Sequence, residues 1–244
     1  MRATQAESIA VSADGSRVAI TDDTGVIVLG LVDDGTYSQV QGSPIKPPRG
    51  TVGLSAVVVA FDPGNAAPDD LVLSESGDGG RSNKGVLLAV GWNDADGTTL
   101  AVSLHGTTTT LRITKLWEYV RKCQADGGQN LIQANGLHIS QGGKWVVAGS
   151  WGCGGESSSN ALVFRGGADG NDNSDSPLAF EESMPGQVWA ASVDAWVDSG
   201  EEHALFAFSS WSSAEAKITM PVLPATEAEI AVFSPPTRQP GNMT

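Results

Sequence analysis

Residues 7–40 read ESIAVSADGSRVAITDDTGVIVLGLVDDGTYSQV, and this stretch decides the fold class. Short runs of Val, Ile and Leu are separated by turns of Gly, Asp and Ser, which is the pattern of β-strands joined by tight turns. The same grouping returns at residues 136–167, GLHISQGGKWVVAGSWGCGGESSSNALVFRGG, and continues into residues 177–183. The sequence therefore predicts a group of four strands that is repeated along the chain.

A second pair of segments, residues 91–117 and 195–222, also aligns well. Each contains a Trp, an acidic Gly-containing turn, a strand, a small-polar turn and then RIT or KIT. Residues 55–90 supply three further strands. Repetition of three or four strands about every 40 to 60 residues is typical of propeller blades, because one small sheet cannot bury both of its faces alone. We therefore predict a single all-β domain, a β-propeller of antiparallel blades.

A period of about 45 residues predicts about five blades in this chain. Four longer blades are the alternative, because GVLLAVGW at residues 85–92 fits either the second or the third blade. Residues 114–124 have helical spacing at Leu116, Val120 and Cys123, and fit either a helix or a long outer strand. The five expected blades span residues 6–48, 52–92, 93–133, 134–183 and 184–236, followed by a tail at 237–244.

Residues 11–31 and 139–164 resemble blades of the broad WD40-like and quinoprotein-like β-propeller superfamily. This resemblance implies the fold over most of the chain, but it implies no activity because the superfamily hosts many unrelated functions. The Gly-His and Trp-Asp dipeptides of WD40 repeats are missing, and SQGGKWVV lacks the Asp of a sialidase Asp-box.

The composition excludes some partners and favours a location. Only 17% of the residues are charged, acids outnumber bases 28 to 14, and no basic cluster is present, so nucleic acid is not expected as a partner. No apolar run approaches the roughly 18 residues of a membrane-spanning helix. Much Ser, Thr, Gly and Asn, little Lys, and a glycosylation sequon at Asn242 favour an extracellular or cell-surface protein. Because no signal peptide is visible, a cytoplasmic location is the alternative.

The two cysteines, Cys123 and Cys153, predict a disulfide if the protein is exported and ordinary thiols if it is cytosolic. They lack the paired spacing of a zinc site. A second metal hypothesis concerns residues 169–175, where oxygen ligands occupy alternate positions as in calcium loops. The sixth place of this loop is Ser174 and the twelfth is Phe180, which depart from the calcium pattern, so a flexible acidic connection is the other interpretation. The calcium ligands would be Asp169, Asn171, Asn173 and Asp175; no other cofactor is expected.

Asp23-Thr24-Gly25 and Asp198-Ser199-Gly200 have the spelling of the two aspartic protease motifs. In the predicted blades these motifs occupy successive turns of a meander, which lie at opposite ends of a sheet. Two carboxylates that share a proton must lie about 3 Å apart. We therefore interpret both motifs as turn chemistry.

The chain has seven Trp and two Tyr, and Trp151 and Trp211 occupy equivalent turns between second and third strands. Each Trp is interpreted either as a platform for a sugar ring or a partner side chain, or as a plug in the seam between blades. The main hypothesis is a non-enzymatic module that binds a glycan or a protein on the face of these turns. The expected residues of this face are Asp22, Asp23, Asp78, Arg81, His105, Trp151 and Trp211.

Two alternatives to this hypothesis remain. A hydrolase resembling propeller lactonases or glycosidases would place Asp23, Asp78 and His105 near the central channel. A structural subunit would use exposed strand edges to form a homo-oligomeric ring or an extracellular filament.

Overall fold

The computed structural model describes most of the chain as β-strands. The described residues are 7–22, 25–51, 53–64, 85–107, 111–123, 130–153, 159–166, 176–184, 186–199, 201–210, 216–221 and 228–233. Within them, no helix has the length and apolar character needed to cross a membrane.

Within the described residues the strands form four antiparallel groups of four in chain order, which we call the first to fourth sheets; the third and fourth join into one eight-stranded sheet through the parallel pairing of β9 and β13. The first sheet contains β1 (Ile9–Val11), β2 (Arg17–Asp22), β3 (Gly25–Leu31) and β4 (Tyr37–Gln39). The second contains β5 (Leu54–Phe61), β6 (Val86–Asp94), β7 (Thr99–Thr107) and β8 (Ile113–Lys122). The third contains β9 (Ile132–Ile139), β10 (Trp145–Ser150), β11 (Ala161–Arg165) and β12 (Leu178–Glu182), with the 3-10 turn η1 (Gln141–Gly143) after β9. The fourth contains β13 (Val188–Asp198), β14 (Glu201–Ser210), β15 (Ala216–Pro221) and β16 (Ala228–Phe233).

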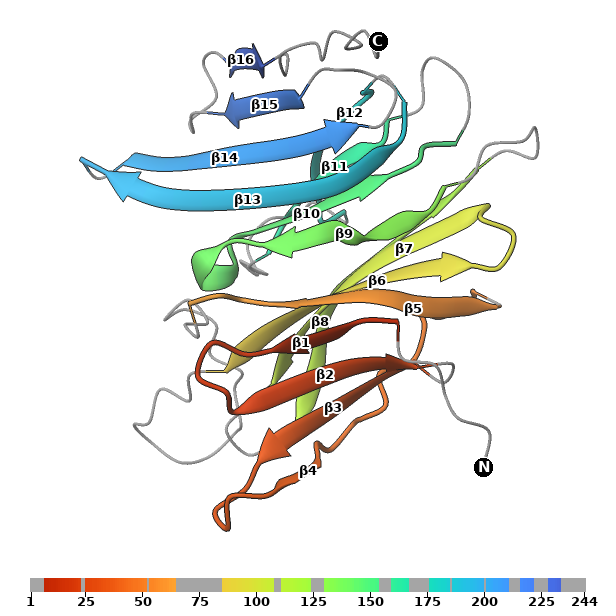
Figure 1. Ribbon diagram of the computed structural model, residues 1–244, viewed down its shortest axis with the longest axis vertical. Helices are drawn as coiled ribbons and strands as arrows, with labels where there is room; N and C mark the ends of the chain where they lie inside the picture. The colour runs from red at the N-terminus through yellow and green to blue at the C-terminus, as the bar shows by residue number, and fades with distance from the viewer. Residues whose placement is uncertain are drawn as a thin grey trace, which may run out of the picture.

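The first strands of successive sheets lie side by side, as the inner strands of propeller blades do. β1, β5, β9 and β13 follow one another in Figure 1, and β13 pairs with β9 in parallel at Ala190 and Asn135. The first sheet extends below this row of strands and the fourth sheet extends above it, whereas strands of the second and third sheets pass behind it (Figure 1). The chain therefore has an all-β fold of propeller-like blades, and its described sheets form an open array.

Each pair of neighbouring sheets encloses an apolar core. Along β6, Leu88 and Val90 pack in the cluster between the first and second sheets, whereas Leu87 and Ala89 pack in the cluster between the second and third. A further cluster around Phe206 and Trp145 joins the third sheet to the fourth. A strand buried on both faces is apolar along its whole length, which explains the continuous run VLLAV.

The sheet containing β6 corrects the predicted blade boundary and decides between the two interpretations of residues 114–124. The proposed boundary between residues 92 and 93 falls inside β6, which forms a hairpin with β7 through register pairs such as Trp92 with Ala101. GVLLAVGW is therefore part of the second strand of a single sheet, and residues predicted as two blades form β5–β8. The segment with helical spacing is the outer strand β8, because its residues pair with β7 throughout.

Polar side chains at the sheet ends bond to the backbone of the next sheet. Asn93 of β6 accepts a hydrogen bond from the Ile132 amide and donates one to the Ile132 carbonyl, each at 2.9 Å. Asp62, which follows β5, accepts from the Gly142 amide at 3.1 Å. His138 of β9 accepts from the amide of Val193 at 3.2 Å through its Nδ1. These bonds fix the positions of neighbouring sheets relative to one another.

A disulfide between Cys123 and Cys153 joins the end of the second sheet to the third, with 5.1 Å between the two Cα atoms. It closes a loop across a sequence separation of 30 residues. Replacing both cysteines with alanine should lower the free energy of unfolding by about 3 to 4 kcal/mol, because the unfolded chain regains the freedom that the loop removes.

This expectation is checked by urea unfolding of the wild type and the double variant, with a thiol titration of the unreduced, denatured wild type. Two free thiols per chain, or equal midpoints for the two proteins, would contradict it.

Candidate functional site

One end of the array carries the connections between second and third strands, at residues 22–25, 94–99 and 150–161, and we call this end the loop face. Successive strands of a meander reverse direction, so first strands begin and fourth strands end at the same face. Trp151, which directly follows β10, lies on the loop face, as does Trp189 near the start of β13.

Trp151 and Trp189 form an aromatic pair at the seam between the third and fourth sheets. Their ring centroids are 5.7 Å apart and their planes are tilted by 40°. The backbone amide of Trp151 donates a 3.0 Å hydrogen bond to the carbonyl of Leu131, which fixes the turn to the start of β9. Trp189 is 37% exposed, so the pair has a large apolar surface in contact with solvent.

Polar atoms without a hydrogen-bond partner are found in the same region. They include the indole Nε1 of Trp151 and both side-chain polar atoms of Asn130, which is fully buried. The backbone amide of Asn130 donates to the Gly97 carbonyl, and Asn130 precedes the residue that holds Trp151. An unmade hydrogen bond at a buried polar group costs about 1 to 3 kcal/mol. Among the described residues, none supplies the missing hydrogen bonds of these atoms.

The scaffold around the aromatic pair is held by several links. The Cys123–Cys153 disulfide lies two residues from Trp151. Arg121 donates to the Ser159 carbonyl at 2.8 Å and lies 3.2 Å from the Glu181 carboxylate. Asn160 accepts a 2.7 Å hydrogen bond from the amide of Met184, in the segment that leads to β13. The disulfide, the ion pair and the hydrogen bonds thus hold together the sheet ends that carry both tryptophans.

His105 lies at the opposite end from Trp151, because it is close to the end of the third strand β7. The structure therefore does not bring these two predicted face residues together. The physical reason is the regrouping of the strands: β7 is a third strand, whereas the prediction made its residues part of a second strand.

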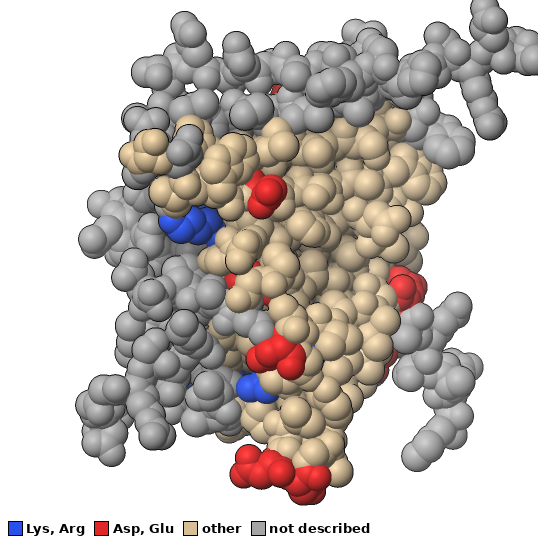
Figure 2. All heavy atoms as spheres, turned by 60° about the vertical axis from the view of Figure 1, so that its left-hand side comes forward, with Lys and Arg blue, Asp and Glu red and all other residues tan. Residues whose placement is uncertain are grey.

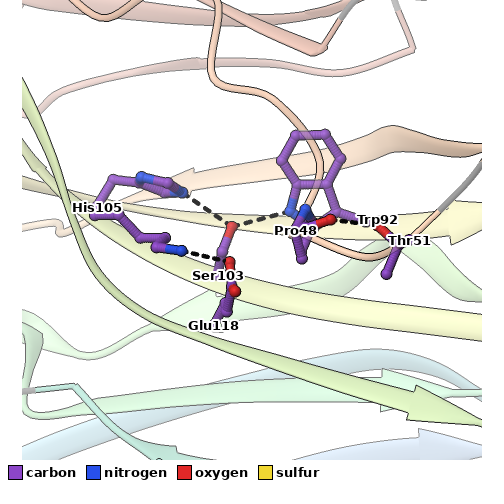
Figure 3. A network of polar contacts seen from close by, with 7 residues as sticks. Pro48, Thr51, Trp92, Ser103, His105 and Glu118 are labelled. Carbon is purple, nitrogen blue, oxygen red and sulfur yellow. Dashed lines mark hydrogen bonds and ion pairs between the residues drawn. The ribbon is translucent and has the colours of Figure 1, made fainter.

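His105 takes part in a buried hydrogen-bond network (Figure 3). Trp92 Nε1 donates to Ser103 Oγ at 2.9 Å, and Ser103 Oγ lies 2.9 Å from His105 Nε2. Because an indole N–H is only a donor, the Ser103 hydroxyl accepts from Trp92 and donates to a neutral imidazole. Burial, reinforced by the positive charge of Lys115, lowers the pKa of His105 from 6.5 to about 3.

This network has the geometry of a nucleophile and a base, but it is a structural feature of the core. A general base works best when its pKa is near the working pH, and His105 is far below it. Ser103 is 2% exposed and His105 is 4% exposed, so a substrate does not reach them in this structure. The described contacts of His105 thus do not support the role given to it in the hydrolase alternative.

Of the other predicted residues, Asp22 ends β2 on the loop face and is buried. Asp198 is the last residue of β13, so it lies at the end opposite the loop face and on a different sheet from Asp22. Within the described residues, no group of three or more His, Cys, Asp and Glu side chains is placed to hold a metal ion. The remaining predicted residues lie outside the described part of the chain: Asp23, Asp78, Arg81, Trp211, Asn242 and the calcium candidates Asp169, Asn171, Asn173 and Asp175.

Sequence reasoning missed Trp189 and Asn130 as members of the site. Trp189 stands in the alternating strand VWAASVDAWVD, where an aromatic residue fits an ordinary strand position. A signal was present in the position of Trp189 near the start of a first strand, on the face where Trp151 was expected. Asn130 had no such signal, because nothing in the sequence shows that its amide is buried.

No protein-family model and no curated protein sequence matches the chain. Among solved structures, the chain is similar to the β-propeller domain of Myceliophteria thermophila Cps50 (Swd1), with 11% identity over 95% of this chain and 54% of that one, at a TM-score of 0.41. The RRP9 WD40 repeats give 11% identity over 94% and 52%, at a TM-score of 0.43. The GH43 endo-arabinanase from Bacillus licheniformis gives 15% identity over 88% and 69%, at a TM-score of 0.41. The chain spans about half the length of the first two structures.

The buried histidine predicts an acid sensitivity of the fold. The folded protein keeps His105 neutral down to about pH 3, whereas the unfolded chain protonates it near 6.5. Between these values the unfolded state binds more protons, so the contribution of His105 is complete above the upper value and is lost as the pH falls, by about 1.4 kcal/mol per pH unit.

Denaturant unfolding of the wild type and of His105→Gln at several pH values measures this contribution. The stability advantage of the wild type over the variant should shrink steadily from pH 6.5 toward pH 3. A constant difference across this range would show that His105 is protonated equally in both states.

Proposed function

We propose that this chain is a non-enzymatic binding module that holds a neutral glycan on the loop face, against Trp151 and Trp189. The observation that carries the proposal is the aromatic pair itself: two indole rings 5.7 Å apart, with Trp189 37% exposed, on a braced seam between two sheets. A Trp that only fills a core is usually buried, because an aromatic ring left in water loses the favourable free energy of burial.

The chemistry of the surroundings favours a saccharide over other ligands with a flat apolar side. A sugar ring offers an apolar face that stacks on an indole and hydroxyl groups that both donate and accept hydrogen bonds. Trp151 Nε1 and the side-chain amide of Asn130 are buried and do not reach a ligand in this structure, so the exposed indole of Trp189 is the part of the pair that a sugar ring would contact. An anionic saccharide is disfavoured, because the chain carries a formal net charge of −14, which repels anions.

An extracellular or cell-surface location accompanies this function. The Cys123–Cys153 disulfide supports it, since structural disulfides persist in oxidising compartments. The hydrolase alternative has less support, because the described contacts make His105 a buried neutral residue. A protein ligand on the same tryptophans is the other outcome that the test distinguishes.

Replacing Trp189 with alanine should weaken binding by about 1 to 3 kcal/mol, because a stacking platform is lost while the chain stays folded. A glycan array screened with the purified wild type supplies the oligosaccharide, and isothermal titration calorimetry with that soluble oligosaccharide measures the affinities.

Trp196→Ala is the matched control: Trp196 lies on the same strand and is 39% exposed, but it is near the opposite end of β13. The control should bind as the wild type does. Equal affinities for the wild type and Trp189→Ala would reject the site, and an array without hits combined with capture of a defined protein ligand would replace the glycan by a protein.

A further inference from the structure

The first sheet has an apolar face that no other described sheet covers. One face of this sheet packs on the second sheet through residues such as Ala19, Val26 and Val28. The register of β1–β4 places the alternate residues together on the other face. These residues are Ile9, Val11, Val18, Ile20, Ile27, Leu29, Leu31, Tyr37 and Gln39, and we call them the free face.

The free face is exposed to an extent that is unusual for its composition. Ile9 is 65% exposed, Val11 57%, Tyr37 46% and Leu31 41%, and the four residues of the face that lie on β2 and at the centre of β3 are partly exposed. Eight of these nine residues are apolar or aromatic, and the next residue on the same side of β2, Asp22, is buried. Contiguous apolar surface of this kind on a folded chain marks an interaction site.

The fourth sheet has the corresponding uncovered face at the other end of the array. Val193 and Phe206 face the core toward the third sheet, so the alternate positions Ser192 and Trp196 of β13 lie on the far side. Leu205 and Ala207 of β14 share that side through the pairs Asp194–Leu205 and Ser192–Ala207. The covered faces of the first and fourth sheets both pack on sheets that pass behind the row of first strands in Figure 1. Both uncovered faces are therefore directed to the same open side.

We propose that a second copy of this chain docks on that open side, so that the free face of each copy packs on the fourth sheet of the other. The contact repeats the packing found between neighbouring sheets inside the chain, where apolar faces meet directly. Two copies related by a two-fold axis make this contact twice and close the two open arrays into one ring.

The area that such a dimer buries agrees with what a stable interface needs. The strands β1, β2, β3 and β4 have 3, 6, 7 and 3 residues, and at about 3.4 Å per residue and about 4.8 Å between strands they give a sheet face of roughly 310 Å². One contact between two such faces buries about 620 Å², well below the range of stable complexes, whereas two contacts bury about 1,240 Å², at its lower end. The area thus favours the closed pair over a dimer that joins two first sheets in a single contact.

Charge also agrees with a second copy as the occupant. The chain carries a formal net charge of −14, yet the exposed residues of the free face carry no charge. On the fourth sheet, the register puts Asp194 and the pair Asp198–Glu201 at alternate positions in line with Ser192, so the acids of this face lie toward one end of β13. Figure 2 shows one side of the molecule, on which uncharged residues make up most of the described surface. The acidic residues of the two copies that lie outside the interface repel each other over longer distances, and salt screens this repulsion. Association should therefore strengthen as ionic strength rises.

Sedimentation velocity of the full chain at micromolar concentration tests the proposal. The expected result is a species of twice the 25.1 kDa of the chain, with a dissociation constant that falls when salt is added. Val11→Glu and Ser192→Glu each place a charge on one of the two faces at an exposed position and should each raise the dissociation constant at least about tenfold. Val120→Glu is the matched control, because Val120 is a 36% exposed apolar residue on the outer strand β8, and it should leave the dimer intact.

Ser192→Glu identifies the arrangement, because the outer face of the fourth sheet takes part in the closed pair and not in a contact between two first sheets. A monomeric wild type overturns the proposal. Dimers of Ser192→Glu that are as stable as those of the wild type also overturn it, since they show contact between two first sheets. Circular dichroism melts of all variants confirm that a loss of association is not a loss of folding. The glycan test measures affinity for a saccharide and this one measures the oligomeric state; because Trp196 lies on the outer face of the fourth sheet, the oligomeric state of Trp196→Ala is measured as well.

Discussion

The structure depends on sheets that are apolar on both faces. Leu87 and Leu88 are neighbours in the sequence, yet they are buried in different cores because side chains alternate across a strand. Each sheet therefore needs a neighbour on either side, and the three cores between four sheets are the result. At about 25 cal/mol per Å² of apolar surface, this burial is the main favourable contribution to folding.

Apolar packing has little direction of its own, so the relative placement of the sheets depends on polar contacts at their ends. Asn93 exchanges two hydrogen bonds with the backbone of Ile132 in the next sheet, and Asp62 accepts from Gly142 across the same seam. Asp62 is fully buried at this seam, and burial raises the pKa of its carboxyl because the charged form loses its contact with water. These contacts fix the packed sheets in one relative arrangement, and they thereby fix the positions of the turns on the loop face.

The two proposed surfaces follow from the two places where this architecture ends. At the loop face, the turns need no regular pairing, so a large residue such as Trp151 stands at a seam and contacts Trp189 of the next sheet. At the ends of the array, the rule that every sheet covers its neighbour fails for the first and fourth sheets. Ligand binding and self-association thus use different parts of the molecule, and a ring of two chains would leave the loop face accessible.

The sequence by itself determined the all-β class, the turn-bounded strands and the loop position of Trp151, because strand periodicity and turn residues are local properties read within about ten residues. It did not determine that 85–92 belongs to the second strand of a sheet, since an apolar run buried on both faces has no alternation to assign it to a neighbour. The position of His105 in the core and the pairing of Trp151 with Trp189 were likewise decided only by the tertiary structure. Both depend on which sheets stack and in what register, and these long-range choices are made by the total burial of the folded chain, which no short segment encodes.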